Sequence, residues 1–380
     1  MKRILLLLFI IIVLILLVNK KEIKENNISE LRGIYISYIE ISKYLNDKDE
    51  ISSKKEIDKM IDNIKTINCN TIVLQVRPST DSIYNSKIFP VSKYLSSKES
   101  YPFDVLKYFI EKSHEQNLKV IAWINPYRIS TTSNINEIKE NSPAFKYIDS
   151  DVVYIGNGIF FNPAKEEVKQ LIIDGVKEVL NYKVDKILFD DYFYPSNDID
   201  ILEYEKVKEK KTIEEFHLEN VNDLIKRVHT ECKKKNIPFG ISPDGNIENN
   251  YNKNYTDVKQ WLSSSEYVDF IMPQLYYGFN NTTKPFIKTI NEWNELIKNK
   301  DIDLYIALAF YKVGTIDTYA KDGKDEWINN NNIIMKEIIY SRNITNYKGF
   351  SLYRYDNIFD ESNFTNTSYS ELKSVKRILK

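Results

Sequence analysis

Residues 186–195 read Lys-Ile-Leu-Phe-Asp-Asp-Tyr-Phe-Tyr-Pro, a short apolar strand that runs directly into two adjacent carboxylates and then into aromatic side chains. Side chains alternate between the two faces of a strand, so Phe189 and Asp191 share one face while Leu188 and Asp190 share the other. This alternation predicts different roles for the two carboxylates. A structural reading also exists, because an Asp at a strand end often caps the next helix or turns the loop.

Similar apolar runs recur along the chain and alternate with amphipathic helical patterns. The sequence predicts strands at 31–38, 71–77, 119–127, 186–193, 238–243, 268–277, 303–311 and 348–355. It predicts helices at 54–67, 103–117, 163–182, 213–236, 256–263, 284–299, 326–341 and 369–379, with Pro163 in the first turn of the third. Eight alternating units indicate the α/β class and one (β/α)8 TIM barrel over residues 31–380.

An apolar segment and a polar linker precede the predicted barrel. Met1-Lys2-Arg3 is followed by an uninterrupted apolar run at 4–18, and residues 19–30 are polar. This run would form a helix of roughly 22 Å, short of the ~30 Å hydrocarbon layer, and it matches the upper end of a signal-peptide core. Residues 1–18 are therefore predicted to be a signal peptide or an uncleaved anchor in the cytoplasmic membrane. Either way, we expect an exported, extracytoplasmic barrel.

Composition argues against several other classes of protein. The 53 basic and 54 acidic residues are interspersed without a basic stripe, so no nucleic-acid partner is expected. Cys69 and Cys232 fall in distant units and are predicted to be buried or idle thiols rather than a disulfide. The three histidines, His114, His217 and His229, fall in predicted helices without metal-ligand spacing. Neither a metal site nor a cofactor is expected.

Polar and aromatic residues gather at the C-terminal end of strand after strand, which is where TIM barrels build their active sites. This repetition favours a functional reading of Asp190 and Asp191. Structural readings stay open for single residues: Arg77 could pair with Asp81 to hold the loop through residue 94, and Tyr353 could belong to the core. The predicted substrate-binding residues are Arg77, Asp81, Asn125, Tyr127, Arg128, Gln274, Tyr276 and Tyr353.

Eight ordered motifs resemble those of the bacterial glycosyl hydrolase-like family 10. They read LRGIY at 31–35, NTIVLQVRP at 70–78, YNSKIFP at 84–90, AWINPYR at 122–128, FNP at 161–163, FDDYFYP at 189–195, FGISP at 239–243 and MPQLY at 272–276. The resemblance implies a TIM-barrel glycosidase of the cell envelope that acts on peptidoglycan glycan strands, particularly strands stripped of peptides. One departure is Asp244, which stands where many relatives carry an aromatic residue and leaves substrate preference open.

Glycoside hydrolysis generally needs one carboxylic acid to protonate the leaving oxygen and a second carboxylate as nucleophile or base. Asp191 is the predicted acid or nucleophile, by analogy with chitinase-type barrels in which strand four also ends in a carboxylate-rich run before Tyr-Pro. Phe193 stands where those enzymes carry their acid Glu, so their substrate-assisted mechanism is not carried over. The partner stays open among Asp190, Asp244 and Asp81, and Asp244 ranks next because it ends the neighbouring strand.

A catalytically silent glycan-binding barrel of the envelope is the alternative function. Aromatic side chains such as Tyr35, Trp123 and Tyr276 would serve such a binder, which would tolerate the loss of Asp191, whereas an enzyme would not. A metal-dependent deacetylase is disfavoured, because the histidines are not clustered. The glycan linkage, the anomeric outcome and the oligomeric state stay open.

Overall fold

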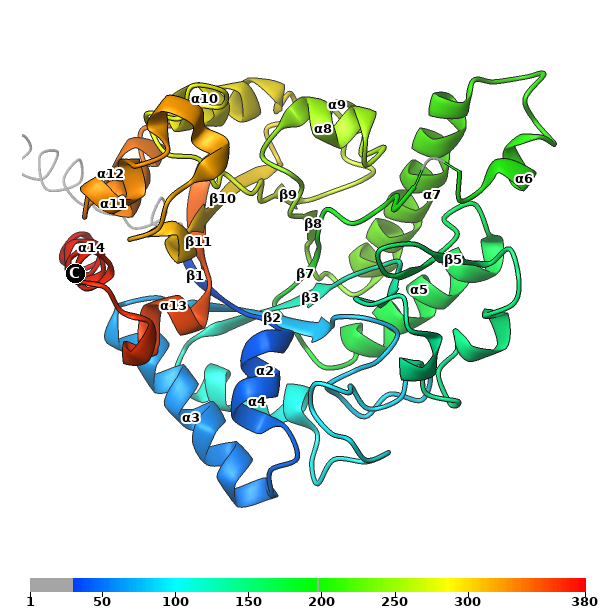
Figure 1. Ribbon diagram of the computed structural model, residues 1–380, viewed down its shortest axis with the longest axis horizontal. Coiled ribbons are helices and arrows are strands. Elements are labelled where there is room, and N and C mark those ends of the chain that lie inside the picture. The colour runs from blue at the N-terminus through cyan, green and yellow to red at the C-terminus, as the bar shows by residue number, and fades with distance from the viewer. Residues whose placement is uncertain (1–29, 197) are drawn as a thin grey trace, which may run out of the picture. The chain divides into compact units, whose positions relative to one another are not determined.

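The computed structural model describes residues 30–196 and 198–380. In this part of the chain, parallel strands close into a barrel with helices around it, which confirms the predicted (β/α)8 fold (Figure 1). The barrel strands are β1 (Leu31–Ile36), β2 (Thr71–Arg77), β3 (Lys119–Ile124), β7 (Lys186–Phe189), β8 (Phe239–Ile241), β9 (Phe270–Ile271), β10 (Asp303–Ala309) and β11 (Tyr347–Tyr353). The predicted signal or anchor at 1–18 lies outside the described residues.

Helices follow the strands in chain order. The longer ones are α3 (Glu50–Thr66), α4 (Val105–Glu115), α5 (Glu166–Leu180), α7 (Ile213–Lys234), α10 (Phe286–Leu296), α12 (Ile333–Ser341) and α14 (Asn366–Ile378). Shorter ones are α2 (Tyr38–Leu45), α6 (Ile201–Tyr204), α8 (Ile247–Asn252), α9 (Val258–Trp261), α11 (Glu326–Asn329) and α13 (Tyr355–Phe359). The helix predicted at 326–341 is two helices, because four consecutive asparagines at 329–332 favour a break in the helix.

Two buried clusters follow the alternation of side chains along the barrel strands. The inner cluster includes Val73, Ile121 and Leu188. The outer cluster includes Leu74 and the apolar faces of the helices. Gly240 lies on the inner face, where an added Cβ would meet the Phe270 ring at 2.5 Å, so the inward Phe270 requires a glycine opposite it.

Several boundaries differ from the predicted ones. Strand β3 ends at Ile124 rather than residue 127, β7 at Phe189 rather than 193, and β9 has two residues. Strand β1 ends at Ile36 and helix α2 begins at Tyr38, because a capping box starts the helix at Ser37. The Ser37 hydroxyl accepts a hydrogen bond from the Ile39 N–H, and the Glu40 carboxylate accepts one from the Ser37 N–H at 2.9 Å. Pro163 lies before α5 rather than in its first turn.

A second sheet, which the sequence did not predict, lies between β3 and α5 along the chain. Its strands are β4 (Arg128–Ser130), β5 (Val153–Ile155) and β6 (Ile159–Phe161), in the order β4-β6-β5 with antiparallel pairing. The chain leaves the barrel after Ile124 to build this sheet. The sheet therefore belongs to the loop region at the C-terminal end of β3.

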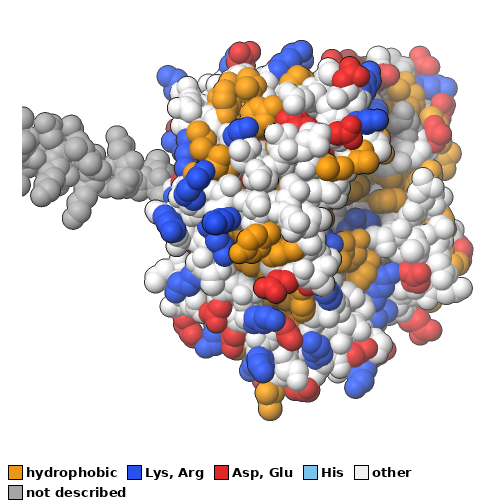
Figure 2. All heavy atoms as spheres, turned by 60° about the vertical axis from the view of Figure 1, so that its left-hand side comes forward, with side chains coloured by type: hydrophobic (Ala, Val, Ile, Leu, Met, Phe, Trp, Pro, Cys, Tyr) orange, Lys and Arg blue, Asp and Glu red, His pale blue; other side chains and the backbone are white. Residues whose placement is uncertain are grey.

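The charge distribution on the surface and the state of the two cysteines can be compared with what the sequence predicts. On the face shown in Figure 2, basic and acidic side chains are interspersed. Cys69 and Cys232 are both buried and are not joined in a disulfide. The His217 and His229 rings each face one carboxylate, that of Asp200 at 2.9 Å and that of Asp269 at 3.2 Å. Within the described ranges, no helix combines the length and apolar character that a membrane span needs, and no acidic, His or Cys cluster suits a metal ion.

Candidate active site

A cavity of about 220 Å³ lies at the C-terminal ends of the barrel strands. It contains both carboxylates of the 186–195 segment, together with three of the predicted substrate-binding residues. Its lining residues are Tyr35, Trp123, Asp190, Asp191, Tyr192, Ser242, Gln274, Tyr276, Tyr311 and Tyr353. The cavity is at the end of the barrel where the sequence predicts the site.

Asp190 continues the inner row of β7 after Leu188 and is 3% exposed. Its Oδ2 accepts a hydrogen bond from Trp123 Nε1 at 2.9 Å and another from the Asn125 amide. Burial raises the pKa of the Asp190 carboxyl, while the charge of Arg128 and the bond from Trp123 oppose that rise. Two donors on one oxygen and a nearby guanidinium favour the ionised form of Asp190.

Asp191 lies beyond the last residue of β7, where side chains need not alternate between the two faces of the strand. Its side chain therefore lines the same cavity as that of Asp190. Its Oδ1 accepts a bond from Gln274 Nε2 at 3.0 Å, and the same amide donates to the Ser242 carbonyl at 3.0 Å. Burial raises the pKa of Asp191, and the charge of Asp190 raises it further. The pair is therefore asymmetric, with the proton favoured on Asp191.

Asn125 and Arg128 act on the site through Asp190 rather than by lining the cavity. Asn125 Oδ1 accepts from Arg128 Nη2 at 2.5 Å and from Gln75 Nε2 at 2.9 Å. Arg128 Nε also donates to the Pro78 carbonyl at 2.8 Å. These bonds fix the side-chain amide of Asn125 so that its NH₂ group faces Asp190.

Five aromatic rings form a wall of the cavity. The Tyr35 and Trp123 ring centroids are 5.5 Å apart, and Tyr276 lies 5.7 Å from Tyr311 and 5.9 Å from Tyr353. Flat apolar faces with hydroxyls at their edges suit a sugar ring, which has both apolar C–H faces and hydroxyls. Tyr353 therefore lines the cavity rather than belonging only to the core.

Arg77 and Tyr127, two of the predicted substrate-binding residues, lie outside this cavity. The β2–β3 register shifts between Gln75 and Arg77, and this bulge turns Arg77 to the outside of the barrel, where its guanidinium lies 4.1 Å from the Phe89 ring centroid. Tyr127 follows the end of β3 and is fully buried in the outer cluster, with its ring 6.4 Å from Phe193. Neither residue lines the cavity.

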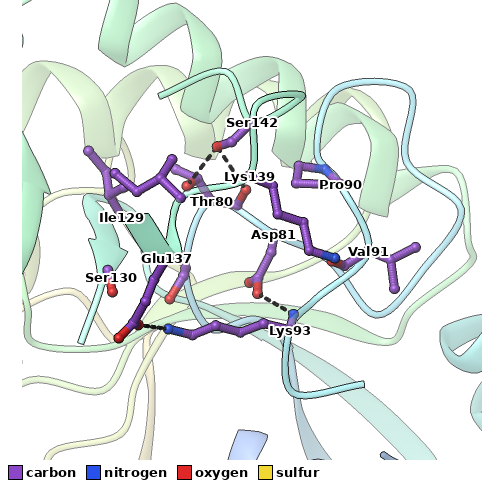
Figure 3. A pocket seen from close by; sticks show the side chains of 12 residues that line it. Thr80, Asp81, Pro90, Val91, Lys93, Ile129, Ser130, Glu137, Lys139 and Ser142 are labelled. Atoms are coloured by element: carbon purple, nitrogen blue, oxygen red, sulfur yellow. Dashed lines mark hydrogen bonds and ion pairs between the residues drawn. The ribbon is translucent and has the colours of Figure 1, made fainter. Parts of the chain in front are cut away.

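Asp81 and Asp244 lie in hydrogen-bonded loops of their own. Asp81 Oδ2 accepts from Ser92 Oγ at 2.7 Å and from the Lys93 N–H at 3.2 Å, beside a separate cavity of about 30 Å³ (Figure 3). It holds the loop through Ser92 rather than through Arg77. Asp244 accepts from the Asn246 N–H at 2.7 Å and from the Asn249 amide at 3.0 Å, and it does not line the active-site cavity.

Sequence reasoning missed part of the lining. Tyr192 lies inside the segment that indicated the site, yet it was not singled out, although its position directly after the two carboxylates was a usable signal. Tyr35 and Trp123 lie on the inner rows of β1 and β3, and they were considered only for glycan stacking. Ser242 and Tyr311 follow the ends of β8 and β10, and the sequence placed both among the polar and aromatic strand-end candidates without selecting them as site residues. Whether these two side chains reach the cavity depends on the residue at which β8 and β10 end.

A closed barrel with paired carboxylates and an aromatic wall at its C-terminal mouth is an arrangement typical of TIM-barrel glycoside hydrolases. Residues 30–327 match the sequence profile described as Glycosyl hydrolase-like 10, and the chain belongs to this family. It is 31% identical over 288 residues to "Glycosyl hydrolase YngK" of Bacillus subtilis (strain 168), a match covering 68% of this chain and 56% of that protein. It is 27% identical over 340 residues to "Glycosyl hydrolase DigH" of Escherichia coli (strain K12), covering 80% and 76%.

Solved structures share the fold at low sequence identity. The glycoside hydrolase domain of PgaB (BpsB) from Bordetella bronchiseptica superposes with a TM-score of 0.57 at 12% identity, covering 90% of this chain and 98% of that one. An exo β-N-acetylglucosaminidase from Vibrio harveyi superposes with a TM-score of 0.54 at 9% identity, covering 92% and 57%. These likenesses show the barrel architecture alone.

Proposed function

We propose that this protein is an exported glycoside hydrolase that cleaves amino-sugar glycans of the cell envelope, with peptide-free peptidoglycan strands as its substrate. One observation carries the proposal. Asp190 and Asp191 lie in one cavity, and only Asp190 has two side-chain donors on one oxygen and a guanidinium nearby. Two carboxyl groups whose environments favour different protonation states are what acid-assisted glycoside cleavage requires.

In this proposal, Asp191 donates its proton to the glycosidic oxygen as the bond from that oxygen to the anomeric carbon breaks. The ionised Asp190 then faces the positive charge that develops on the sugar ring. Water adds to the anomeric carbon and returns a proton to Asp191. Gln274 orients the acid through its bond to Asp191 Oδ1. Asp244 is a weaker candidate for the partner, because it does not line the cavity that holds Asp191.

Three features support the choice of substrate and location. The aromatic wall offers flat faces for pyranose rings, and the tyrosine hydroxyls and Gln274 offer hydrogen bonds. The family membership and the relatives described as glycosyl hydrolases agree with glycan cleavage. The apolar run at 4–18 supports export to the envelope, where peptidoglycan is found.

The experiment is to incubate the barrel, residues 30–380, with peptide-free peptidoglycan strands and to analyse the products by mass spectrometry. We expect shortened strands from the wild type and none from Asp191→Asn. If the wild type produces no fragments from these strands, from chitin oligomers or from other envelope glycans, but still binds them, the protein is a glycan-binding barrel.

A further inference from the structure

A second cavity of about 370 Å³ adjoins the active site. The two cavities share Tyr192, whose side chain is 54% exposed. The walls of the second cavity come from the β5–β6 hairpin and from the segment that follows Asp191. A chain of sugars leaving the active site across Tyr192 would therefore enter this cavity.

The sheet beside this cavity carries a row of side chains that leads away from the carboxylates. Arg128 on β4 pairs in register with Phe160 on β6, and Phe160 pairs with Tyr154 on β5. Directly paired residues lie on the same face of a sheet, and neighbouring strands are ~4.8 Å apart, so the row spans roughly 10 Å. The row begins at the guanidinium that acts on Asp190 and ends at Tyr154. It is long enough for more than one pyranose ring.

The chemistry of the second cavity matches that of an uncharged sugar. Tyr154 and Phe160 provide ring faces, and Asn157 and Asn254 provide amide donors and acceptors. The described residues that line it carry no charged side chain. Tyr194, which also lines this cavity, is fixed by its neighbours. Its hydroxyl donates to the Asp200 carboxylate at 2.8 Å, and its ring centroid lies 4.5 Å from that of His217.

We propose that this cavity is a glycan subsite that binds the uncharged N-acetylglucosamine units of the strand held in the active site. The inference rests on the proposed function for the direction of the glycan, and it adds the residues that hold the sugars beyond the cleavage point. The charged groups of a stem peptide would find no partner among the described lining residues. A free lactyl carboxylate would find no cationic partner there either, so the subsite favours the uncharged N-acetylglucosamine units of the strand.

The test measures the binding of chitohexaose and chitobiose to the full chain, purified in detergent and carrying Asp191→Asn so that bound sugar is not cleaved. Adding Tyr154→Ala should raise the Kd for chitohexaose about tenfold, as truncation of an aromatic anchor does. The Kd for chitobiose, which the active-site cavity alone can hold, should change less than about twofold. Tyr154→Phe should retain chitohexaose binding, because it keeps the ring.

The matched control is Tyr369→Ala, which removes an exposed tyrosine from α14, on the opposite side of the barrel from β5 (Figure 1). Equal melting temperatures of the three variants would show that they fold alike. Equal chitohexaose affinity in Tyr154→Ala and Tyr369→Ala would overturn the subsite. If the wild type still cleaves peptide-free strands in that case, the proposed hydrolase function is unaffected. Conversely, selective loss of chitohexaose binding in Tyr154→Ala with no cleavage by the wild type would sustain the subsite and overturn the hydrolase. If chitohexaose binds to no variant, the subsite is overturned as well.

Discussion

The ends of β2 and β7 both carry carboxylates, and these carboxylates differ in what surrounds them. Asp81 follows β2, and Asp190 and Asp191 follow β7. Burial raises the pKa of all three. The cavity beside Asp81 measures about 30 Å³, room for a water molecule, whereas the cavity at the end of β7 measures about 220 Å³.

The partners of the carboxylates differ as well. Asp81 Oδ2 is bonded to Ser92 and to the Lys93 backbone within one loop, while the Lys139 ammonium nearby donates to the Val91 carbonyl at 2.9 Å (Figure 3). Asp191 instead receives one amide bond from another strand end and faces an aromatic wall. A raised pKa is thus common to both sites, and room for a substrate separates the reactive site from the structural one.

The largest expected effect is on turnover, and it compares one carboxylate from each of the two strand ends. Asp191→Asn should lower kcat on peptide-free strands by about 10² to 10⁴, because the amide cannot donate an acidic proton. Asp81→Asn, the matched change at the other strand end, should keep kcat within about twofold. Turnover of both variants on one substrate preparation, with circular dichroism to check folding, measures this difference. Equal losses would place Asp81 in the machinery.

The next effect concerns pH. Asp191 acts in its protonated form, so kcat/KM should fall as pH rises through its raised pKa. Asp190→Asn removes the negative charge that raises the pKa of Asp191, so this fall should move to lower pH. The loss of rate should be smaller than that in Asp191→Asn. Asp244→Asn is the control, because the Asp244 charge raises the pKa of Asp191 less than the Asp190 charge does. The measurement is the pH dependence of kcat/KM for each variant. If the fall at high pH stays at the same pH in Asp190→Asn, the Asp190 charge does not raise the pKa of Asp191.

A third effect compares two arginines that the sequence assigned to one site. Arg128→Met should lower kcat/KM about tenfold, because it frees the Asn125 amide and removes a charge that favours ionised Asp190. Arg77→Met should keep kcat/KM within about twofold, because Arg77 packs on Phe89 outside the barrel. Steady-state kinetics of both variants on peptide-free strands would reveal the difference. A larger loss in Arg77→Met would contradict the placement of Arg77.

The smallest effect is on stability. The folded-state pKa of Asp81 is raised by burial, so the folded protein keeps this proton where the unfolded chain has lost it, and stability falls as pH rises through that interval. Asp81→Asn removes this cost and keeps an oxygen for Ser92 and Lys93. The variant should gain about 1 kcal/mol, or about 2–4 °C in Tm, at pH 8. The gain should be smaller at pH 4, which thermal unfolding at both pH values can check.

Much of the fold was predictable because its signals are local. Apolar runs alternating with amphipathic stretches predicted all eight barrel strands, and the position of Asp190 and Asp191 at a strand end predicted the mouth of the barrel. The β4–β6 sheet was missed because each of its strands has three residues, too few for a periodic pattern. Helix α2 was missed in part because its capping box begins directly after β1.

The sequence by itself determined the barrel, the family and the end of the barrel at which polar residues gather, since these depend on periodicity and on the order of motifs. Only the tertiary structure decided which strand-end residues share a cavity. A register shift in β2 turned Arg77 outward, the early end of β7 let both carboxylates face inward, and local hydrogen bonds kept Asp244 in its own loop. The physical reason is that a displacement of one residue reverses the face on which a strand side chain lies, and long-range pairing sets that register.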